Sequence, residues 1–194
     1  LMIVAMMVSC NPKDEDDNNN SGGNGNNGGG SDGEIAGEIA GHGYVDLGLP
    51  SGLKWATCNV GATSAEDYGD YFAWGETSPK AEYTYENSIT YGEQMSDISG
   101  NAQYDAATAN WGGSWRMPTK DEMQELLDYC EFEWIQVNGV YGSKLIGPNG
   151  SCIFLPAAGY RDGSSLYDAG DYGYYWSSTP SDSYYFDDGA YSLY

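Results

Sequence analysis

The strongest constraint on the fold is a helix signal that begins at Thr119. The Thr119 hydroxyl can accept a hydrogen bond from the backbone N–H of Glu122, and the Glu122 carboxylate can reach back to the N–H of Thr119. This reciprocal pattern is a capping box, which marks a helix start. Apolar residues follow at helical spacing, at Met123, Leu126, Leu127 and Cys130. We therefore expect a helix that buries this stripe against a core.

Most of the remaining pattern is typical of short strands. Runs rich in aromatic and β-branched residues are bounded by Gly, Pro, Asn or Asp, as at residues 71–74, 134–137 and 152–155. One or two helices among many short strands separated by turns is an α+β arrangement. About 150 residues remain after the first 40, enough for one domain with a hydrophobic core. The sequence predicts one α+β domain over residues 43–194.

The first ten residues indicate export and a lipid anchor. Residues 1–8 are apolar, too few to span a bilayer, and followed by Ser9-Cys10. This pattern resembles the end of a lipoprotein signal peptide, in which Cys10 is lipidated and becomes the mature N-terminus. The alternative is an N-terminal strand buried in the domain, with Cys10 as an ordinary cysteine.

Residues 11–42 are predicted to be a flexible tether. Residues 13–17 (Lys-Asp-Glu-Asp-Asp) resemble the acidic export signal of Bacteroides-group surface lipoproteins, and residues 18–33 are almost wholly Asn, Gly and Ser. A segment without apolar side chains to bury cannot offset its ordering entropy. Random-coil scaling gives the tether a reach of about 30 Å. We expect a lipid-anchored outer-membrane protein that faces the cell exterior; an acidic linker on a periplasm-facing lipoprotein is the alternative.

The charge and the residue counts argue against several classes of function. The chain has a formal charge of −22, with 7 Lys and Arg in total and one His, whereas nucleic-acid binding draws on clustered cations. The same charge disfavours anionic lipid headgroups, so the membrane contact is expected through the lipid alone. Without a second His, the usual catalytic triads and histidine metal sites cannot be assembled. We predict no catalytic residue, no metal and no cofactor.

Two further groups of residues bear on chemistry. The thiols after Cys10 contain no Cys-x-x-Cys pair, which gives a zinc site little support: Cys58, Cys130 and Cys152. A glycoside hydrolase needs only a pair of carboxylates, so a hydrolase that acts on surface glycans is the enzymatic alternative. Its candidate acids are Glu66, Asp67, Asp70, Glu76, Asp182, Asp187 and Asp188.

Four blocks of sequence follow one another in the order and at the spacing typical of a known protein family: residues 46–55, 111–119, 150–159 and 173–179. Together they resemble the Fibrobacter succinogenes major paralogous domain, a family of bacterial surface proteins that looks like a branch of the C-type lectin-like fold. The resemblance implies short twisted antiparallel strands with one or two helices and many loops. Domains of this family continue with another strand or two beyond the position of Tyr194, so we expect the chain to be a fragment.

The family blocks also contain the residues expected to hold the domain together. These structural residues are Trp55, Trp74, Trp115, Arg116, Thr119, Glu122 and Trp176. Arg116 is expected to form an ion pair with Glu76 or Asp70. The Glu-Pro-Asn and Trp-Asn-Asp motifs with which many C-type lectins hold sugar through calcium are not visible.

The last 35 residues are the most informative about partners, because they hold nine of the 18 Tyr, interleaved with Ser, Asp and Gly. This composition resembles an antibody paratope, in which Tyr gives large contact area at low entropic cost. It also resembles the variable proteins of diversity-generating retroelements. Candidate ligand-binding residues are Tyr167, Tyr172, Tyr184, Tyr185, Asp187 and Asp188, whereas Tyr174, Tyr175 and Trp176 are assigned mainly to the core.

We therefore predict a non-enzymatic, surface-exposed lipoprotein that binds an extracellular glycan or protein through its Tyr-rich C-terminal loops. A subunit at the tip of a surface appendage is a further alternative, beside the hydrolase. For the Tyr-rich region itself, the alternative is a loop that is aromatic-rich without a binding role.

Overall fold

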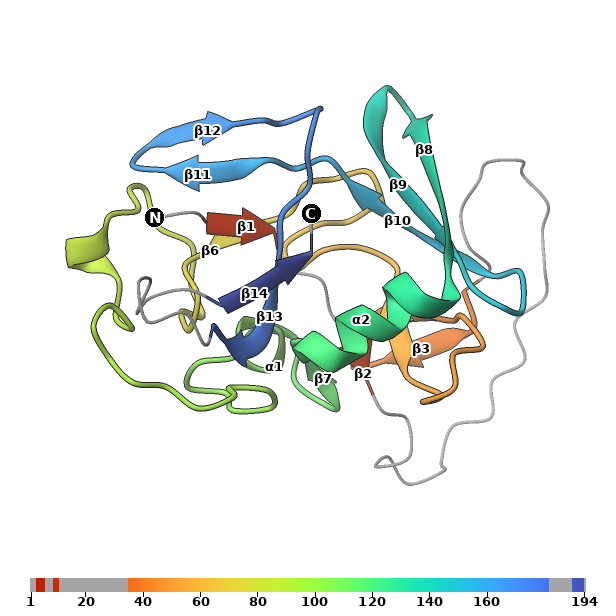
Figure 1. Cartoon of the computed structure of the whole chain (residues 1–194), viewed down its shortest axis with the longest axis horizontal. Helices are drawn as coiled ribbons and strands as arrows, with labels where there is room; N and C mark the ends of the chain where they lie inside the picture. The colour runs from red at the N-terminus through yellow and green to blue at the C-terminus, as the bar shows by residue number, and fades with distance from the viewer. Residues whose placement is uncertain (1–2, 6–8, 11–34, 182–189, 194) are drawn as a thin grey trace.

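The computed structural model of the 194-residue chain describes residues 3–5, 9–10, 35–181 and 190–193. Over these residues the chain forms two α-helices, one short 3-10 helix (η2, Tyr85–Asn87) and three small sheets in which most strand pairs are antiparallel. Figure 1 shows the sheets around α2, with a long irregular segment after β6 at one end of the molecule. The predicted α+β class is confirmed.

The helix predicted at Thr119 is confirmed as α2 (Lys120–Tyr129), with both hydrogen bonds of the capping box present. Met123 and Leu126 are buried, as expected for the apolar stripe. The pattern places Leu127 in the same stripe, but Leu127 is 46% exposed because α2 packs along a narrower face than the pattern predicts. A second, shorter helix, α1 (Ala106–Trp111), is capped by the Asp105 side chain, which accepts from the backbone N–H of Thr108.

The first sheet has the order β3-β4-β5-β2-β7. Its strands are β3 (Gly37–Ile39), β4 (His42–Asp46), β5 (Lys54–Ala56), β2 (Ser9–Cys10) and β7 (Trp115–Arg116). The folded region therefore begins before residue 43, the expected domain boundary, because Ile39 is buried and β3 pairs with β4. His42 is stacked on Trp111 with 4.0 Å between ring centroids, and partial burial lowers the pKa of His42.

The second sheet has the order β12-β11-β1-β13-β14, with β6 paired to β1. Its strands are β12 (Ser165–Tyr167), β11 (Tyr160–Asp162), β1 (Ile3–Ala5), β13 (Tyr175–Pro180), β14 (Ala190–Leu193) and β6 (Tyr71–Phe72). Both β1 and β2 come from residues 1–10, which the sequence places in a signal peptide outside the domain. The arrangement is that of the alternative, an N-terminal strand within the fold. Lipidation of Cys10 stays a prediction.

The third sheet is an antiparallel meander in the order β8-β9-β10, formed by β8 (Glu131–Val137), β9 (Val140–Ile146) and β10 (Cys152–Pro156). Asn138 and Gly139 connect β8 to β9 with φ angles of 48° and 89°. Positive φ at both central residues is the geometry that matches the twist of a two-residue hairpin, and Asn-Gly is its preferred sequence. The hairpin projects from the body of the molecule (Figure 1).

The four structural Trp residues are buried in the core: Trp55, Trp74, Trp115 and Trp176. The Trp74 indole N–H donates to the carbonyl of Ser177 at 2.9 Å, and that of Trp115 donates to the carbonyl of Ile39 at 2.8 Å. These bonds tie distant segments to one another through buried side chains. Across the described part of the chain, none of the helices has the length and apolar character needed to cross a bilayer.

The ion pair of Arg116 differs from the expected one. Its guanidinium binds Glu122 in a two-pronged contact, with Nη1 donating to Oε2 at 2.7 Å, and neither Glu76 nor Asp70 is its partner. Glu76 instead accepts from Lys80 at 2.7 Å. Arg116 ends β7 just before α2, so the carboxylate of the first helical turn lies within reach. The same Glu122 oxygen also accepts from the N–H of Thr119, so one carboxylate caps the helix and holds the strand.

Candidate ligand-binding surface

An open groove lies between the β8–β9 hairpin and the segment that connects β12 to β13. Its volume is about 690 Å³, and it is lined by Trp134, Tyr141, Gly170, Asp171 and Tyr172. All three rings are about half exposed, at 54% for Trp134, 47% for Tyr141 and 55% for Tyr172. We call these five residues the aromatic groove.

The hairpin places two of these rings on one face. Trp134 pairs with Ser143, and Gln136 pairs with Tyr141, so Trp134 and Tyr141 are diagonal neighbours across the two strands. Diagonal neighbours on one face of an antiparallel pair are within reach of aromatic side chains. The two ring planes are nearly parallel, at 4°, with 6.2 Å between centroids. The hairpin therefore presents two aligned, accessible aromatic faces.

The opposite wall of the groove is held by backbone hydrogen bonds. The N–H groups of Asp171 and Tyr172 both donate to the carbonyl of Asp168, and the carbonyl of Tyr172 accepts from the N–H of Gly159 at 2.7 Å. Gly159 has φ 65°, and a Cβ added there would lie 2.0 Å from the carbonyl oxygen of Tyr167. Because this wall is fixed through its backbone, the Asp171 and Tyr172 side chains remain available to a ligand.

Tyr172 connects the groove to a row of tyrosines, Tyr160, Tyr167, Tyr172 and Tyr174, which we call the tyrosine strip. Tyr160 and Tyr167 pair across β11 and β12, with their rings stacked at 5.5 Å. Tyr160 meets Tyr174 edge-on at 5.3 Å, and Tyr174 lies 6.2 Å from Tyr172. Tyr174 also donates to the Asp168 carboxylate at 3.3 Å. Partial burial and the neighbouring Asp168 charge raise the pKa of Tyr174.

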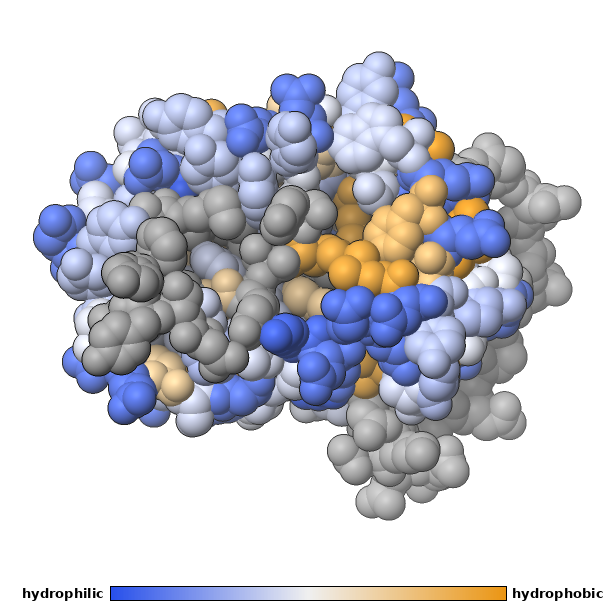
Figure 2. Space-filling model, viewed as in Figure 1, coloured by the Kyte–Doolittle hydropathy of each residue, from blue (hydrophilic) through white to orange (hydrophobic). Residues whose placement is uncertain are grey.

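Below the aromatic groove an apolar patch reaches α2. A smaller cavity of about 200 Å³ is lined by Leu127, Phe132, Leu155, Leu193 and other residues, including Trp134 and Tyr172 of the groove. Figure 2 shows this orange region on the same face as the hairpin, bordered by the hydrophilic surface of α2. The exposure of Leu127 is explained by its position in this cavity rather than against the core.

The predicted binding residues fall into two groups. Tyr167 and Tyr172 are exposed and belong to the tyrosine strip, whereas Tyr184, Tyr185, Asp187 and Asp188 lie outside the described residues. Of the residues assigned to the core, Tyr175 is buried, with its hydroxyl donating to the carbonyl of Pro156 at 2.7 Å, but Tyr174 is only half-buried. The sequence reading missed Trp134 and Tyr141; the available signal was Phe132 and Trp134 at alternate positions of a strand.

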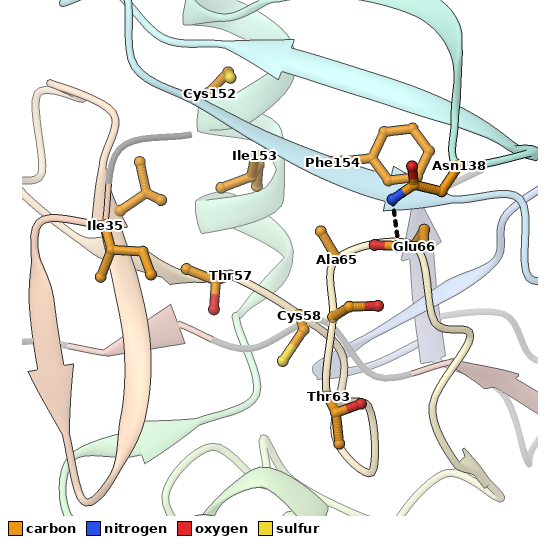
Figure 3. Close-up of a pocket in the computed structure, with 12 residues that line it drawn as sticks. Ile35, Thr57, Cys58, Thr63, Ala65, Glu66, Asn138, Cys152, Ile153 and Phe154 are labelled. Atoms are coloured by element: carbon orange, nitrogen blue, oxygen red, sulfur yellow. Dashed lines mark hydrogen bonds between the residues drawn. The ribbon is translucent and has the colours of Figure 1, made fainter. Parts of the chain in front are cut away.

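A second cavity, of about 320 Å³, lies between β10 and the loop that follows β5, lined in part by Thr57, Cys58, Glu66, Cys152 and Phe154. Figure 3 shows Cys58 and Cys152 on different walls, and Glu66 accepting from the Asn138 amide at 2.7 Å. Both cysteines are free thiols, and burial raises the pKa of Cys58. Cys130 is also a free thiol, with a pKa raised by burial to about 11.

The structure describes four of the candidate acids for a hydrolase, and three of them hold structural contacts through their carboxylates: Glu66, Asp67 and Glu76. The fourth, Asp70, is exposed. Besides Glu66 and Glu76, Asp67 accepts from the Thr63 hydroxyl at 3.0 Å. Asp182, Asp187 and Asp188 lie outside the described residues. Within the described ranges, no three His, Cys, Asp or Glu side chains lie close enough together to hold a metal ion.

Comparisons of the chain with protein-family models, with curated proteins and with solved structures find no match. The resemblance to the Fibrobacter succinogenes major paralogous domain therefore stays a prediction, and function is argued from the surface itself.

Proposed function

We propose that this chain is a non-enzymatic, lipid-anchored surface protein that binds an extracellular ligand, first a glycan and otherwise a protein, through the aromatic groove and the tyrosine strip. The observation that carries the proposal is a continuous row of aromatic rings. The exposed rings of Tyr167 and Tyr172 are joined through the half-buried rings of Tyr160 and Tyr174, and Tyr172 lines the groove with Trp134 and Tyr141. We further propose that the domain has a C-type lectin-like fold and belongs to the Fibrobacter succinogenes major paralogous domain family.

The arrangement of the groove suits a sugar. The apolar C–H faces of a pyranose can lie on the accessible faces of Trp134 and Tyr141, while the Asp171 carboxylate accepts hydrogen bonds from its hydroxyls. Binding pockets of this kind combine aromatic walls with a few polar groups that fix orientation. Because the chain carries a formal charge of −22, a neutral glycan fits better than an anionic one.

A protein ligand is the second candidate, and the apolar patch favours it. Leu127 and Phe132 add exposed apolar surface next to the groove, and exposed patches of this kind mark interaction sites. Tyr and Trp side chains are enriched among the residues that dominate protein interfaces. The same groove would then serve as the centre of a larger interface.

The lipid anchor and the tether complete the proposal. A lipidated Cys10 would hold the chain at the outer membrane, and the Asn, Gly and Ser of residues 18–33 would let the domain stand clear of the headgroups. Diversification of Tyr-rich positions by a retroelement would act on the same face, since Tyr167 and Tyr172 are exposed there.

The test sets a neutral-glycan array and a protein pulldown beside a panel of glycoside hydrolase substrates, all with the full chain. We expect saturable binding without turnover, lost on Trp134→Ala. Turnover abolished by a single Asp or Glu substitution would overturn the non-enzymatic assignment. Recovery of the protein in sheared appendage fractions would replace the free surface domain with an appendage subunit.

A further inference from the structure

Two of the three sheets depend on strands from the extreme N-terminus. In the first sheet β2 lies between β5 and β7: Ser9 pairs with Trp55 and Arg116, and Cys10 pairs with Lys54 and Trp115. Among the described strands, β7 has no sheet partner other than β2. The link between β7 and the rest of this sheet is therefore made by residues 9–10.

The second sheet shows the same dependence on β1. Val4 pairs with Phe72 of β6 on one edge and with Tyr160 of β11 on the other, and Ala5 pairs with Tyr175 of β13. Within the described sheets, β6 pairs only with β1. Figure 1 shows β1, in red, among β6, β11, β13 and β14 rather than at an outer edge. Five strands thus converge on the positions of residues 3–5 and 9–10.

The surroundings define what can occupy these positions. Several of the paired residues are buried, among them Trp55, Phe72, Trp115 and Tyr175, and others, such as Lys54 and Arg161, are half-buried. The positions are therefore largely enclosed by the fold. An unfilled position there would leave backbone N–H and C=O groups of the flanking strands without partners. The occupant must be extended, apolar and free of Pro at the paired positions, because Pro has no N–H to donate.

Lipoprotein processing and this arrangement exclude each other. Maturation at Cys10 would remove residues 1–9, and with them all of β1 and Ser9 of β2. Cys10 would then become the acylated end of a tether and could not remain between β5 and β7.

From this conflict, and resting on the processed lipoprotein proposed above, we propose that the position of residues 3–5 and 9–10 is a strand-acceptor site. In the unprocessed chain the leader fills the site in cis. In the processed protein the site takes, from a partner polypeptide, two extended apolar stretches that match β1 and β2 in length, three and two residues. Adding a strand to an open sheet position is a known mode of peptide recognition, in which main-chain hydrogen bonds supply affinity.

The experiment starts from the full chain with a protease site inserted among residues 18–33. After cleavage, the N-terminal piece is displaced with mild denaturant, and the remaining domain is titrated with a labelled synthetic peptide of residues 1–10. The control peptide carries Val4→Pro and Ser9→Pro, which keep the apolar character but remove two N–H donors. Binding is measured by fluorescence anisotropy, and stability by thermal melting.

We expect the N-terminal piece to stay bound after cleavage until it is displaced. The displaced domain should then bind the peptide at one site and gain about 5–10 °C in Tm at 100 times its Kd. The Pro peptide should bind at least tenfold more weakly, and the uncut chain should bind neither. A domain that unfolds on displacement and refolds with the first peptide alone also supports the proposal.

Equal binding of both peptides overturns the proposal. So does a displaced domain that keeps the Tm of the uncut chain and binds no peptide, or one that unfolds and that neither peptide restores. The mass of the mature N-terminus in cells tests processing separately, so failure of the lipoprotein assignment and failure of the acceptor site can be told apart.

Discussion

Replacing Glu122 by Gln should destabilise the domain because one carboxylate serves two partners. Glu122 accepts from Arg116 Nη1 at 2.7 Å and from the N–H of Thr119 at 2.8 Å, and Nη2 provides a further bond. A hydrogen bond to a charged group contributes about 1.5–3 kcal/mol. The Arg116 and Glu122 side chains are each 22% exposed, and Gln retains one acceptor oxygen, so we expect a loss of about 2–3 kcal/mol.

The pH dependence identifies the carboxylate as the cause. Desolvation acts to raise the pKa of Glu122, but the hydrogen bonds from Arg116 and Thr119 outweigh it, so the net pKa is lowered from 4.5. A lowered folded-state pKa gives stability that is complete above the unfolded value and is lost as the pH falls through the folded value. The difference between wild type and Glu122→Gln should therefore be largest near neutral pH and shrink below pH 4.5.

Urea denaturation from about pH 7 down to about pH 2 measures this difference. The matched control is Asp121→Asn, an exposed acid in the same helical turn, which should cost at most about 1 kcal/mol. A Glu122→Gln loss below about 0.5 kcal/mol at neutral pH, or a loss that stays constant into acid, would refute the assignment of this ion pair as a stabilising contact.

Three further predictions follow from burial, backbone geometry and the anchor. Leu126→Ala should lower the free energy of unfolding by about 2–5 kcal/mol, because the side chain is buried. Leu127→Ala should lower it by less than about 1 kcal/mol, because Leu127 is 46% exposed. Equal losses in urea denaturation would contradict the packing of α2. Gly159→Ala should cost at least about 2 kcal/mol, because φ is 65° and the new Cβ would clash with the carbonyl of Tyr167; a Tm like that of wild type would show that this backbone can shift. Cys10→Ala should release the protein from membranes in cell fractionation, and protease treatment of intact cells should remove the wild-type domain; a domain cut only after lysis would contradict the outward orientation while leaving the anchor in place.

The sequence predicts features that are encoded locally and misses those set by tertiary neighbours. The capping box at Thr119 involves residues within one turn, so the start of α2 could be read directly. Arg116 pairs with Glu122 rather than with Glu76 because of the way β7 leads into α2. No local sequence pattern predicts that geometry. The folded region begins before the expected boundary at residue 43. Ile39 is buried and β3 pairs with β4, so the sheet includes residues expected in the tether.

The candidate surface shows the same limit. The composition of the C-terminal region predicts Tyr167 and Tyr172 as binding residues. The structure brings them to one face through the pairing of β11 with β12 and through the backbone bonds at Gly159. The sequence predicts a strand over residues 134–137 but does not state which face of that strand is covered. Whether one face of a hairpin is covered depends on what packs against it, and here the groove leaves Trp134 about half exposed.

The most direct test of the account is the affinity of the full chain for the ligand that the glycan and protein screens return. Calorimetric titration of wild type, Trp134→Ala and Tyr172→Ser is compared with Tyr91→Ser, an exposed tyrosine that does not line the groove. The account predicts at least about tenfold weaker binding for the first two variants at unchanged Tm, and no change for the third. Affinity unchanged by Trp134→Ala and Tyr172→Ser, or lost only together with Tm, would contradict the claim that this aromatic surface is the binding site.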